Sequence, residues 1–260
     1  MSNELEIPKE GKYIYGIIRY AGPIDYGPIG IGTRDDIVYG VCFNDISAIV
    51  SNSPIIQYGA RRANIIAHQK VLEEVMKRFT VLPVRFSTIS EHNDNTGILR
   101  ILERDYNKFS DLLNKMEGKK ELGLKVLAHE EAMYESIVEK YEDIRILRGK
   151  LINLHPDKTH YHRTKIGEMV SEALKKENEH YKNKILSVLN PQSEDVKIND
   201  NYGDMMILNV AFLIKNSAEP GFDKAVKDFD EKYGRFMTFK YVGTLPPYNF
   251  VNLVINTKGV

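Results

Sequence analysis

The chain has 260 residues, of which 42% are hydrophobic and 28% are charged, and this composition is typical of a folded globular protein with room for two domains. Its 36 Lys and Arg residues balance its 36 Asp and Glu residues, so no overall charge favours nucleic acid or an anionic membrane as a partner. The polar N-terminal stretch lacks the apolar region of a secretory signal, and no segment approaches the about 18 uninterrupted apolar residues of a membrane span. Cys42 is the single cysteine, which excludes a disulfide within the chain and fits a reducing cytoplasm.

Residues 1–118 predict an N-terminal mixed α/β domain with the element order βββαβα. β-Branched and aromatic residues over 12–20 indicate a strand, and two short runs between 36 and 51 indicate a hairpin. Apolar residues at helical spacing over 61–79 predict an amphipathic helix, and the same spacing over 98–116 predicts a second one.

Between these helices, the segment VLPVRFST at 81–88 predicts a strand that follows the first helix almost without a loop. Side chains alternate along a strand, so Leu82 and Phe86 share one face while Arg85 lies on the other. Pro83 favours an edge or a bulge. An arginine in such an apolar segment needs an acceptor or a surface role, and a snorkelling or hydrogen-bonded arginine remains the alternative to a binding role.

Residues 119–260 predict a second domain with the order βαββαβ, which is the ferredoxin-like arrangement, so the whole chain is expected to be an α+β protein of two domains. A long antiparallel helical hairpin over 130–190, with a connecting turn at 153–159, occupies the first helix position. The remaining elements are expected to be strands at 120–131, 193–200, 205–214 and 237–243 and a helix at 219–233.

The C-terminal tail, residues 244–260, is unusually apolar for a free end, and consecutive prolines stiffen it. Such a segment must dock, either on its own domain or by returning to the first domain. Aromatic anchors on a stiff segment also suit an interface, so Tyr248, Asn249 and Phe250 join Arg85 as candidate interface residues.

The known signatures of catalytic and cofactor sites are missing from the sequence. Neither a G-x-S-x-G nucleophile elbow nor a G-x-x-x-x-G-K-[ST] loop occurs, and the glycines of GPIGIGTRDD precede a strand, which favours a hairpin loop over a nucleotide site. His155, His160 and His162 could bind zinc or nickel, yet their spacing matches no known site and a solvated turn is preferred. We therefore expect no metal, no cofactor and no catalytic residue.

His68 interrupts the apolar stripe of the first helix, three residues after Ile65 and four before Leu72. This spacing places the imidazole against the sheet. A buried histidine usually hydrogen-bonds a neighbour, so we interpret His68 as a structural polar residue. An enzyme that uses His68 with a carboxylate would instead require it to be accessible in a cleft.

Four segments, in the same order, make the chain similar to the GvpF/GvpL family of gas-vesicle proteins. They are AHQKVLEEVM at 67–76, VLPVRFST at 81–88, KELGLKV at 120–126 and PPYNF at 246–250. Two departures are visible: the family commonly has Gly where Ser87 stands, and commonly Gly-Pro-Trp where this chain has Gly-Thr-Leu at 243–245. The segments do not distinguish an F member from an L member.

The resemblance implies a cytoplasmic, gas-vesicle-associated accessory protein without a catalytic step. It also implies that the partners are the small hydrophobic shell protein and other accessory gas-vesicle proteins, with no nucleic acid, membrane or small-molecule substrate involved. Three alternatives remain open from the residues: a ferredoxin-like small-molecule sensor or regulatory module, an enzyme built on His68, and an RNA-binding sheet, which the absence of an RNP1-type motif disfavours.

Overall fold

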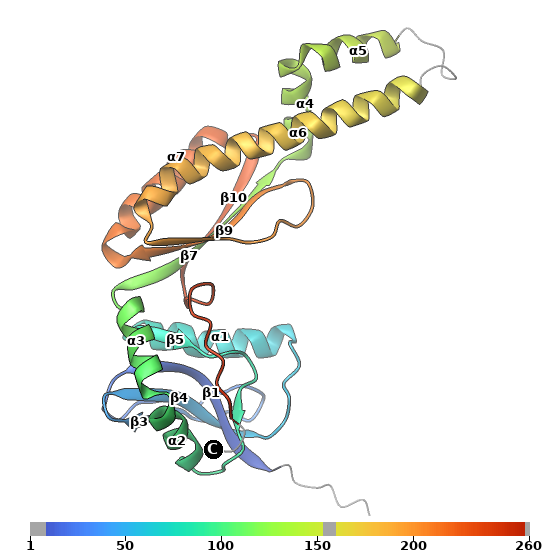
Figure 1. Ribbon diagram of the computed structural model, residues 1–260. Helices are drawn as coiled ribbons and strands as arrows, with labels where there is room; N and C mark the ends of the chain where they lie inside the picture. The colour runs from blue at the N-terminus through green and yellow to red at the C-terminus, as the bar shows by residue number, and fades with distance from the viewer. Residues whose placement is uncertain (1–8, 153–159, 258–260) are drawn as a thin grey trace, which may run out of the picture. The chain divides into compact units, whose positions relative to one another are not determined.

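The computed structural model describes residues 9–152 and 160–257, which fall into two compact units. The first unit is drawn from Met1–Glu121 together with Thr244–Val260, and the second is Leu122–Gly243 (Figure 1). The chain therefore passes from one unit to the other twice, after Glu121 and after Gly243.

The first unit combines one sheet with helices, as its β-branched strands and amphipathic helical stripes predict. Its elements are β1 (Glu10–Arg19), β2 (Asp25–Gly27), β3 (Val38–Phe43), β4 (Ile46–Pro54), α1 (Arg62–Met76), β5 (Val81–Pro83), β6 (Ile89–Ser90), α2 (Thr96–Arg104) and α3 (Tyr106–Met116). The strand order is β2-β3-β4-β1-β5, and β6 also pairs with β1. Long antiparallel pairings join β1 to β4 and β4 to β3, so β1 and β4 form the centre of the sheet.

One core of this unit lies between α1 and the sheet. Val71, Leu72 and Val75 of α1 are fully buried there against β1, where Tyr13 and Tyr15 face the helix. The pairing of β1 with β4 shifts register between Ile14 and Gly16, so the strand is bulged at Tyr15. These contacts position the polar groups that are described in the next subsection.

The second unit carries long helices and a sheet of four strands. Its elements are β7 (Lys119–Ala128), α4 (Glu130–Lys140), α5 (Glu142–Ile152), α6 (His160–Leu189), η2 (Asn190–Gln192), β8 (Asp195–Ile198), β9 (Met206–Lys215), η3 (Asn216–Ala218), α7 (Glu219–Tyr233) and β10 (Met237–Leu245). The strand order is β10-β7-β9-β8. β9 is buried along almost its whole length, as a central strand should be, whereas the short edge strand β8 is largely exposed.

Two expected helices are each divided in the structure. The helix predicted over 98–116 is interrupted at Asp105, where φ is −103° and ψ is 14°, which gives α2 and α3. The first helix of the hairpin is interrupted at Tyr141, where φ is −100° and ψ is 101°, which gives α4 and α5. At this break the Tyr141 hydroxyl donates to Glu177 on α6 at 2.8 Å. The predicted turn at 153–159 lies outside the described residues.

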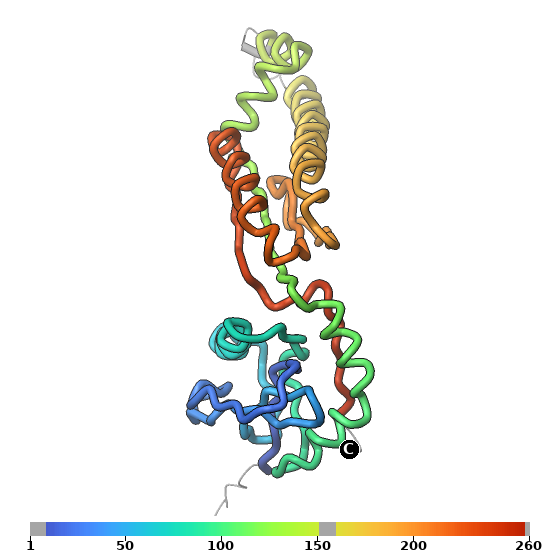
Figure 2. The backbone as a smooth tube through the Cα atoms, turned by 90° about the vertical axis from the view of Figure 1, so that its left-hand side faces the viewer, coloured from blue at the N-terminus to red at the C-terminus, as the bar shows by residue number. Residues whose placement is uncertain are grey.

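The tail also differs from the expected domain arrangement, in which residues 244–260 belonged with the second domain. In the structure the described part of the tail belongs to the first unit. Its apolar side chains Val251, Leu253 and Ile255 are buried, and the intervening residues are exposed, which is the alternation of an extended segment lying on a surface. Figure 2 shows this tail in red.

Candidate functional site

The segment 81–88 is a short strand followed by a turn, not the continuous strand that its sequence predicts. β5 lies at the edge of the sheet and ends at Pro83, and an edge strand tolerates a proline, which has no amide hydrogen. The Val84 amide still donates to the Tyr15 carbonyl at 2.9 Å, and the Thr88 hydroxyl donates to the Arg85 carbonyl at 2.6 Å to close the turn. The Arg85 side chain is exposed at this turn.

Ser87 adopts a φ of +63° in this turn, a backbone conformation that favours glycine. Its hydroxyl accepts a hydrogen bond from the Tyr58 amide at 2.9 Å, and its own amide donates to the Tyr13 hydroxyl at 2.9 Å. The strained residue therefore connects the loop before α1 to the central strand β1.

His68 is buried beneath this turn, with 3% of its surface exposed. Its Nδ1 lies 2.9 Å from the Tyr13 hydroxyl, and its ring stacks on Tyr15 at a centroid distance of 5.6 Å. If the Tyr13 hydroxyl donates to Nδ1, the ring carries its proton on Nε2, and this hydrogen is the one group of the pair without a partner. If the ring instead carries its proton on Nδ1 and donates to Tyr13, the Tyr13 proton and the Nε2 lone pair both lack a partner. We therefore assign the neutral Nε2–H tautomer.

Burial in this apolar and aromatic setting lowers the pKa of His68 from 6.5 to about 4, because the charged form loses its hydration. Burial likewise raises the pKa of the Tyr13 hydroxyl, with the nearby Tyr248 adding a smaller contribution in the same direction. Near neutral pH both groups are uncharged, and their arrangement is that of a hydrogen-bonded core pair and not of an acid and a base open to a substrate.

A second polar chain runs beside the first. The Ile31 amide donates to the Tyr15 hydroxyl at 2.7 Å, and the Tyr15 hydroxyl lies 3.0 Å from the Ser51 hydroxyl. Tyr58 reaches the Ser53 hydroxyl on β4 at 3.0 Å. These bonds satisfy hydroxyl groups that would otherwise be buried without partners, and they fix the loop of Ile31 onto the sheet.

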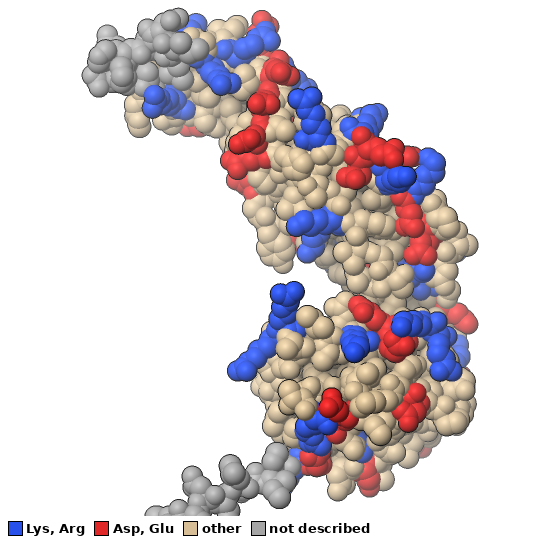
Figure 3. All heavy atoms as spheres, turned by 180° about the vertical axis from the view of Figure 1, so that it is seen from behind, with Lys and Arg blue, Asp and Glu red and all other residues tan. Residues whose placement is uncertain are grey.

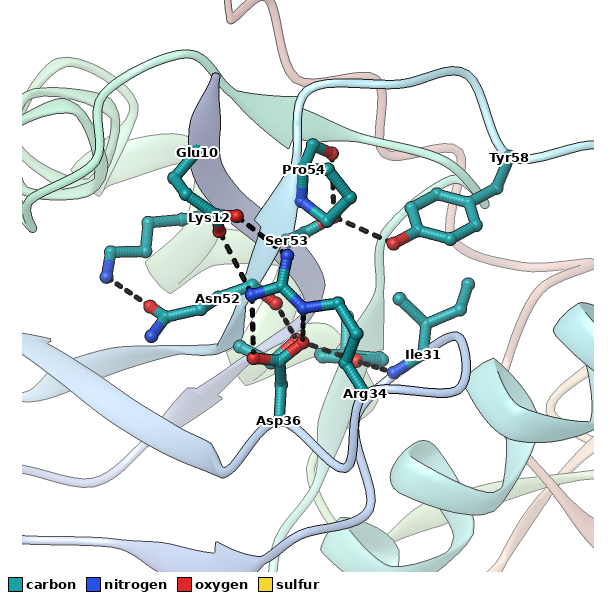
Figure 4. A network of polar contacts seen from close by, with 11 residues as sticks. Glu10, Lys12, Ile31, Arg34, Asp36, Asn52, Ser53, Pro54 and Tyr58 are labelled. Carbon is teal, nitrogen blue, oxygen red and sulfur yellow. Dashed lines mark hydrogen bonds and ion pairs between the residues drawn. The ribbon is translucent and has the colours of Figure 1, made fainter. Parts of the chain in front are cut away.

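At the edge of the same region, Arg34 joins β1 to the loop before β3 (Figure 4). Its guanidinium binds both carboxylate oxygens of Glu10, at 2.7 and 3.2 Å, and its Nε lies 3.2 Å from Asp36. Lys12 donates to Asn52 across the neighbouring strands at 2.5 Å. These charges are matched within the chain, so this network has a structural role.

The tail is held by a buried carboxylate. Glu121, with 2% of its surface exposed, accepts hydrogen bonds from the Asn249 amide at 2.9 Å and from the Asn249 side-chain Nδ2 at 2.6 Å. Burial raises the pKa of Glu121, while the two bonds from Asn249 oppose that rise. Farther along, Arg104 donates to the Asn256 carbonyl at 3.0 Å.

The four candidate interface residues therefore lie in different settings. Arg85 is exposed, and its side chain makes no hydrogen bond or ion pair with any other residue that the structure describes. Tyr248 is 44% exposed, and Phe250 is half-buried. The side-chain amide of Asn249 donates a hydrogen bond to Glu121. Tyr13 connects the surroundings of Arg85 and Tyr248. Its hydroxyl accepts a hydrogen bond from Ser87, two residues after Arg85, and Tyr248 is one of the groups that raise its pKa.

Sequence reasoning missed Glu121, and it noted Ser87 only as a departure from the family. An acidic residue inside the apolar run KELGLKV signals a buried carboxylate that needs donors, although the run does not tell where the donors come from. Of the histidines that were weighed as metal ligands, His155 lies outside the described residues. No cluster of three or more His, Cys, Asp or Glu side chains suited to a metal ion occurs within 9–152 and 160–257.

Basic and acidic side chains are interspersed on the face of the described residues that Figure 3 shows, in keeping with the balanced composition. Among the helices of the described residues, none has the length and apolar character to cross a membrane. This face therefore offers local charges and not a broad field of one sign.

Comparison with known proteins assigns these features to a family. The family model of the gas vesicle synthesis protein GvpL/GvpF matches residues 11–252. Gas vesicle protein F of Nostoc sp. is 26% identical over 249 residues, which cover 94% of this chain and 98% of that protein. Gas vesicle protein F1 of Halobacterium salinarum is 26% identical over 253 residues, which cover 96% of each.

Solved structures agree with the sequence comparison. The crystal structure of GvpF from Anabaena sp. matches with a TM-score of 0.79 at 25% identity, over 94% of this chain and 99% of that one. GvpF from Microcystis aeruginosa matches with a TM-score of 0.70 over the same shares, also at 25% identity.

Proposed function

The chain belongs to the GvpL/GvpF family of gas vesicle synthesis proteins, and from this premise we propose that it is a non-enzymatic accessory protein of gas-vesicle assembly. Its proposed partners are the small hydrophobic shell protein and other accessory gas-vesicle proteins, and its proposed location is the cytoplasm, in association with gas vesicles. The relatives support a role in gas-vesicle assembly, since the matched proteins of Nostoc sp. and Halobacterium salinarum are gas vesicle proteins.

The observation that carries the proposed contact role is the exposed Arg85 on a braced turn. A guanidinium without a partner among the described residues can form charge-assisted, bidentate hydrogen bonds with a carboxylate of another protein. The half-exposed Tyr248 of the tail adds an aromatic side chain, and arginine and tyrosine are enriched in interface hot spots. We propose that Arg85 and Tyr248 contact the partner directly, with Phe250 beside them, and that Asn249 fixes the tail.

For the second unit, we propose the ferredoxin-like arrangement. With β7, β8, β9 and β10 taken as strands one to four, the order across the sheet is four-one-three-two, and the helices α4, α5 and α6 stand between the first two strands. This order supports the split βαβ interpretation. The fold name itself implies no ligand or activity.

A co-purification assay tests the proposed function. Tagged full-length protein should retain the shell protein or a co-encoded accessory protein, and deletion of its gene should impair vesicle formation. If the wild-type protein retains none of these and vesicles form normally without it, the proposal is wrong.

The contact role of Arg85 needs its own comparison. Arg85→Ala should reduce retention of the partner about tenfold, as expected for the loss of an interface arginine. The melting temperature should stay within about 2 °C, because the Arg85 side chain bonds no other residue that the structure describes. Arg100→Ala is the matched control, since Arg100 is an exposed arginine on α2 of the same unit. Equal retention by both variants would show that Arg85 is only a surface charge.

A further inference from the structure

The second unit contains an open groove of about 780 Å³ lined by α4, α5, α6 and the residues just before β9. Its walls are mainly apolar. The apolar side chains that line it include Tyr134, Val138, Ile144, Ile166, Val170 and Leu174. Along α6 the lining extends from Arg163 to Leu174, a span of about 16 Å at the rise of an α-helix.

Charged residues line the two ends of this groove, with opposite signs. Glu131 and Glu135 lie near the start of α4, directly after β7, and Asp204 lies just before β9, so the end next to the sheet is acidic. Arg148 of α5 and Arg163 near the start of α6 make the other end basic. Figure 1 shows α5 and the start of α6 at the end of this unit away from its sheet.

These charges are not neutralised within the described chain. The side chains of the three acidic and two basic residues form no ion pair or hydrogen bond with another described residue, in contrast to Lys140 on the same helical layer, which binds the buried Glu177 at 2.7 and 2.9 Å. An apolar surface with unpaired opposite charges at its two ends complements a ligand of the reverse polarity.

Gly167 gives a separate indication of what fits the groove. It lies in the interior of α6, where glycine lowers helix stability relative to alanine, and it lines the groove. A Cβ at this position would meet no atom within 4 Å, so no contact within the described chain requires glycine. The missing side chain leaves space through which another backbone can approach α6 closely.

We propose that this groove binds one amphipathic α-helix of a partner gas-vesicle protein, about three turns long, with its apolar stripe on the groove walls. The helix carries Lys or Arg at the end that meets Glu131, Glu135 and Asp204, and Asp or Glu at the end that meets Arg148 and Arg163. Its N-terminus lies at the acidic end, where the helix dipole is favourable. The identity of the partner rests on the proposed function, whereas the shape and polarity of the helix rest on the groove.

The probe is a pair of synthetic peptides of about 14 residues, acetylated and amidated so that the ends are uncharged. Both have the same leucine stripe and the same composition. One has its lysines in the first turn and its glutamates in the last turn, and the other alternates them along the polar face. Fluorescence anisotropy with the full-length protein at low salt should give at least tenfold tighter binding of the first peptide.

Variants distinguish binding in the groove from non-specific binding of the peptides elsewhere on the protein. Arg148→Glu combined with Arg163→Glu should abolish the preference for the first peptide, whereas Lys165→Glu, an exposed residue of α6 outside the groove lining, should leave it unchanged. Gly167→Leu should weaken binding at least tenfold, while the thermal melt shows the unit to be at least as stable, because leucine favours a helix more than glycine does.

Equal affinity for the two peptides, absence of binding, or unchanged binding by Gly167→Leu would overturn the groove proposal. If the peptides do not bind as expected while the wild-type protein still retains the shell protein, the groove proposal is wrong and the proposed function stands. If the peptides bind as expected but no gas-vesicle protein is retained, the groove recognises a helix and the proposed function is wrong.

Discussion

The buried His68 makes a quantitative prediction about acid stability. In the unfolded chain the imidazole takes up a proton near its ordinary pKa of 6.5, whereas in the folded chain desolvation holds the pKa at about 4. The unfolded state therefore binds more protons between these values, and stability falls as the pH falls through this window. The linkage relation gives a loss of about 2 kcal/mol near pH 5 and about 3 kcal/mol near pH 4 from this residue alone.

Urea unfolding near pH 7 and near pH 5 measures this loss, followed by circular dichroism because the chain has no tryptophan. His68→Gln is the control, since its amide oxygen can accept the proton of Tyr13 and does not titrate. The wild type should lose about 2 kcal/mol more than the variant on acidification. A His68 ring that titrates near 6.5 by NMR, or equal losses in the two proteins, would refute the reasoning.

Substitutions at three other positions test the contacts that hold each unit together. Ser87→Gly removes about 1 kcal/mol of left-handed backbone strain together with a hydrogen bond of similar value, so its urea midpoint should stay near that of the wild type, whereas Ser87→Ala should be about 1 kcal/mol less stable than Ser87→Gly. A Ser87→Ala variant as stable as Ser87→Gly would count against the strain argument. Asn249→Ala leaves the buried Glu121 with one donor fewer and should cost about 1–3 kcal/mol near neutral pH. Thermal melts should show this cost shrinking in acid, where the carboxyl is protonated, and a cost independent of pH would exclude the ionised form. Lys140→Met removes the ammonium from the buried Glu177 and should lower stability by about 1 kcal/mol, since Lys140 itself is more than half exposed. The loss should be smaller in high salt, and melts at two salt concentrations would show whether it is.

The pattern of apolar residues along the sequence predicted the elements that bury one face, or both faces, along their whole length. The helix at 219–233 has the bounds of α7, and the apolar run at 205–214 is β9 with a shift of one residue. The breaks at Asp105 and Tyr141 could not be predicted in this way, because the apolar stripe continues through each of them on the same face. A tertiary contact lies at the second break, where Tyr141 bonds Glu177, 36 residues away along the chain.

The segment 81–88 shows a different limit. Alternation of apolar and polar side chains predicted one strand, but the backbone leaves the sheet after Pro83 and turns through the positive φ of Ser87. A serine gives no local sign of that conformation. The glycine that the family commonly has at this position would have indicated it, because glycine is the residue that a left-handed turn position favours.

The segments that carry the family resemblance are joined to each other inside the first unit. His68, from the first helix, and Ser87, from the turn, both bond the hydroxyl of Tyr13. Glu121, from KELGLKV, binds Asn249 of PPYNF. These bonds maintain a packed arrangement, so the segments that carry the resemblance have a role in folding. The partner contacts should therefore be sought at exposed residues next to these segments, and Arg85, which the braced turn presents without a partner of its own among the described residues, is the first of them.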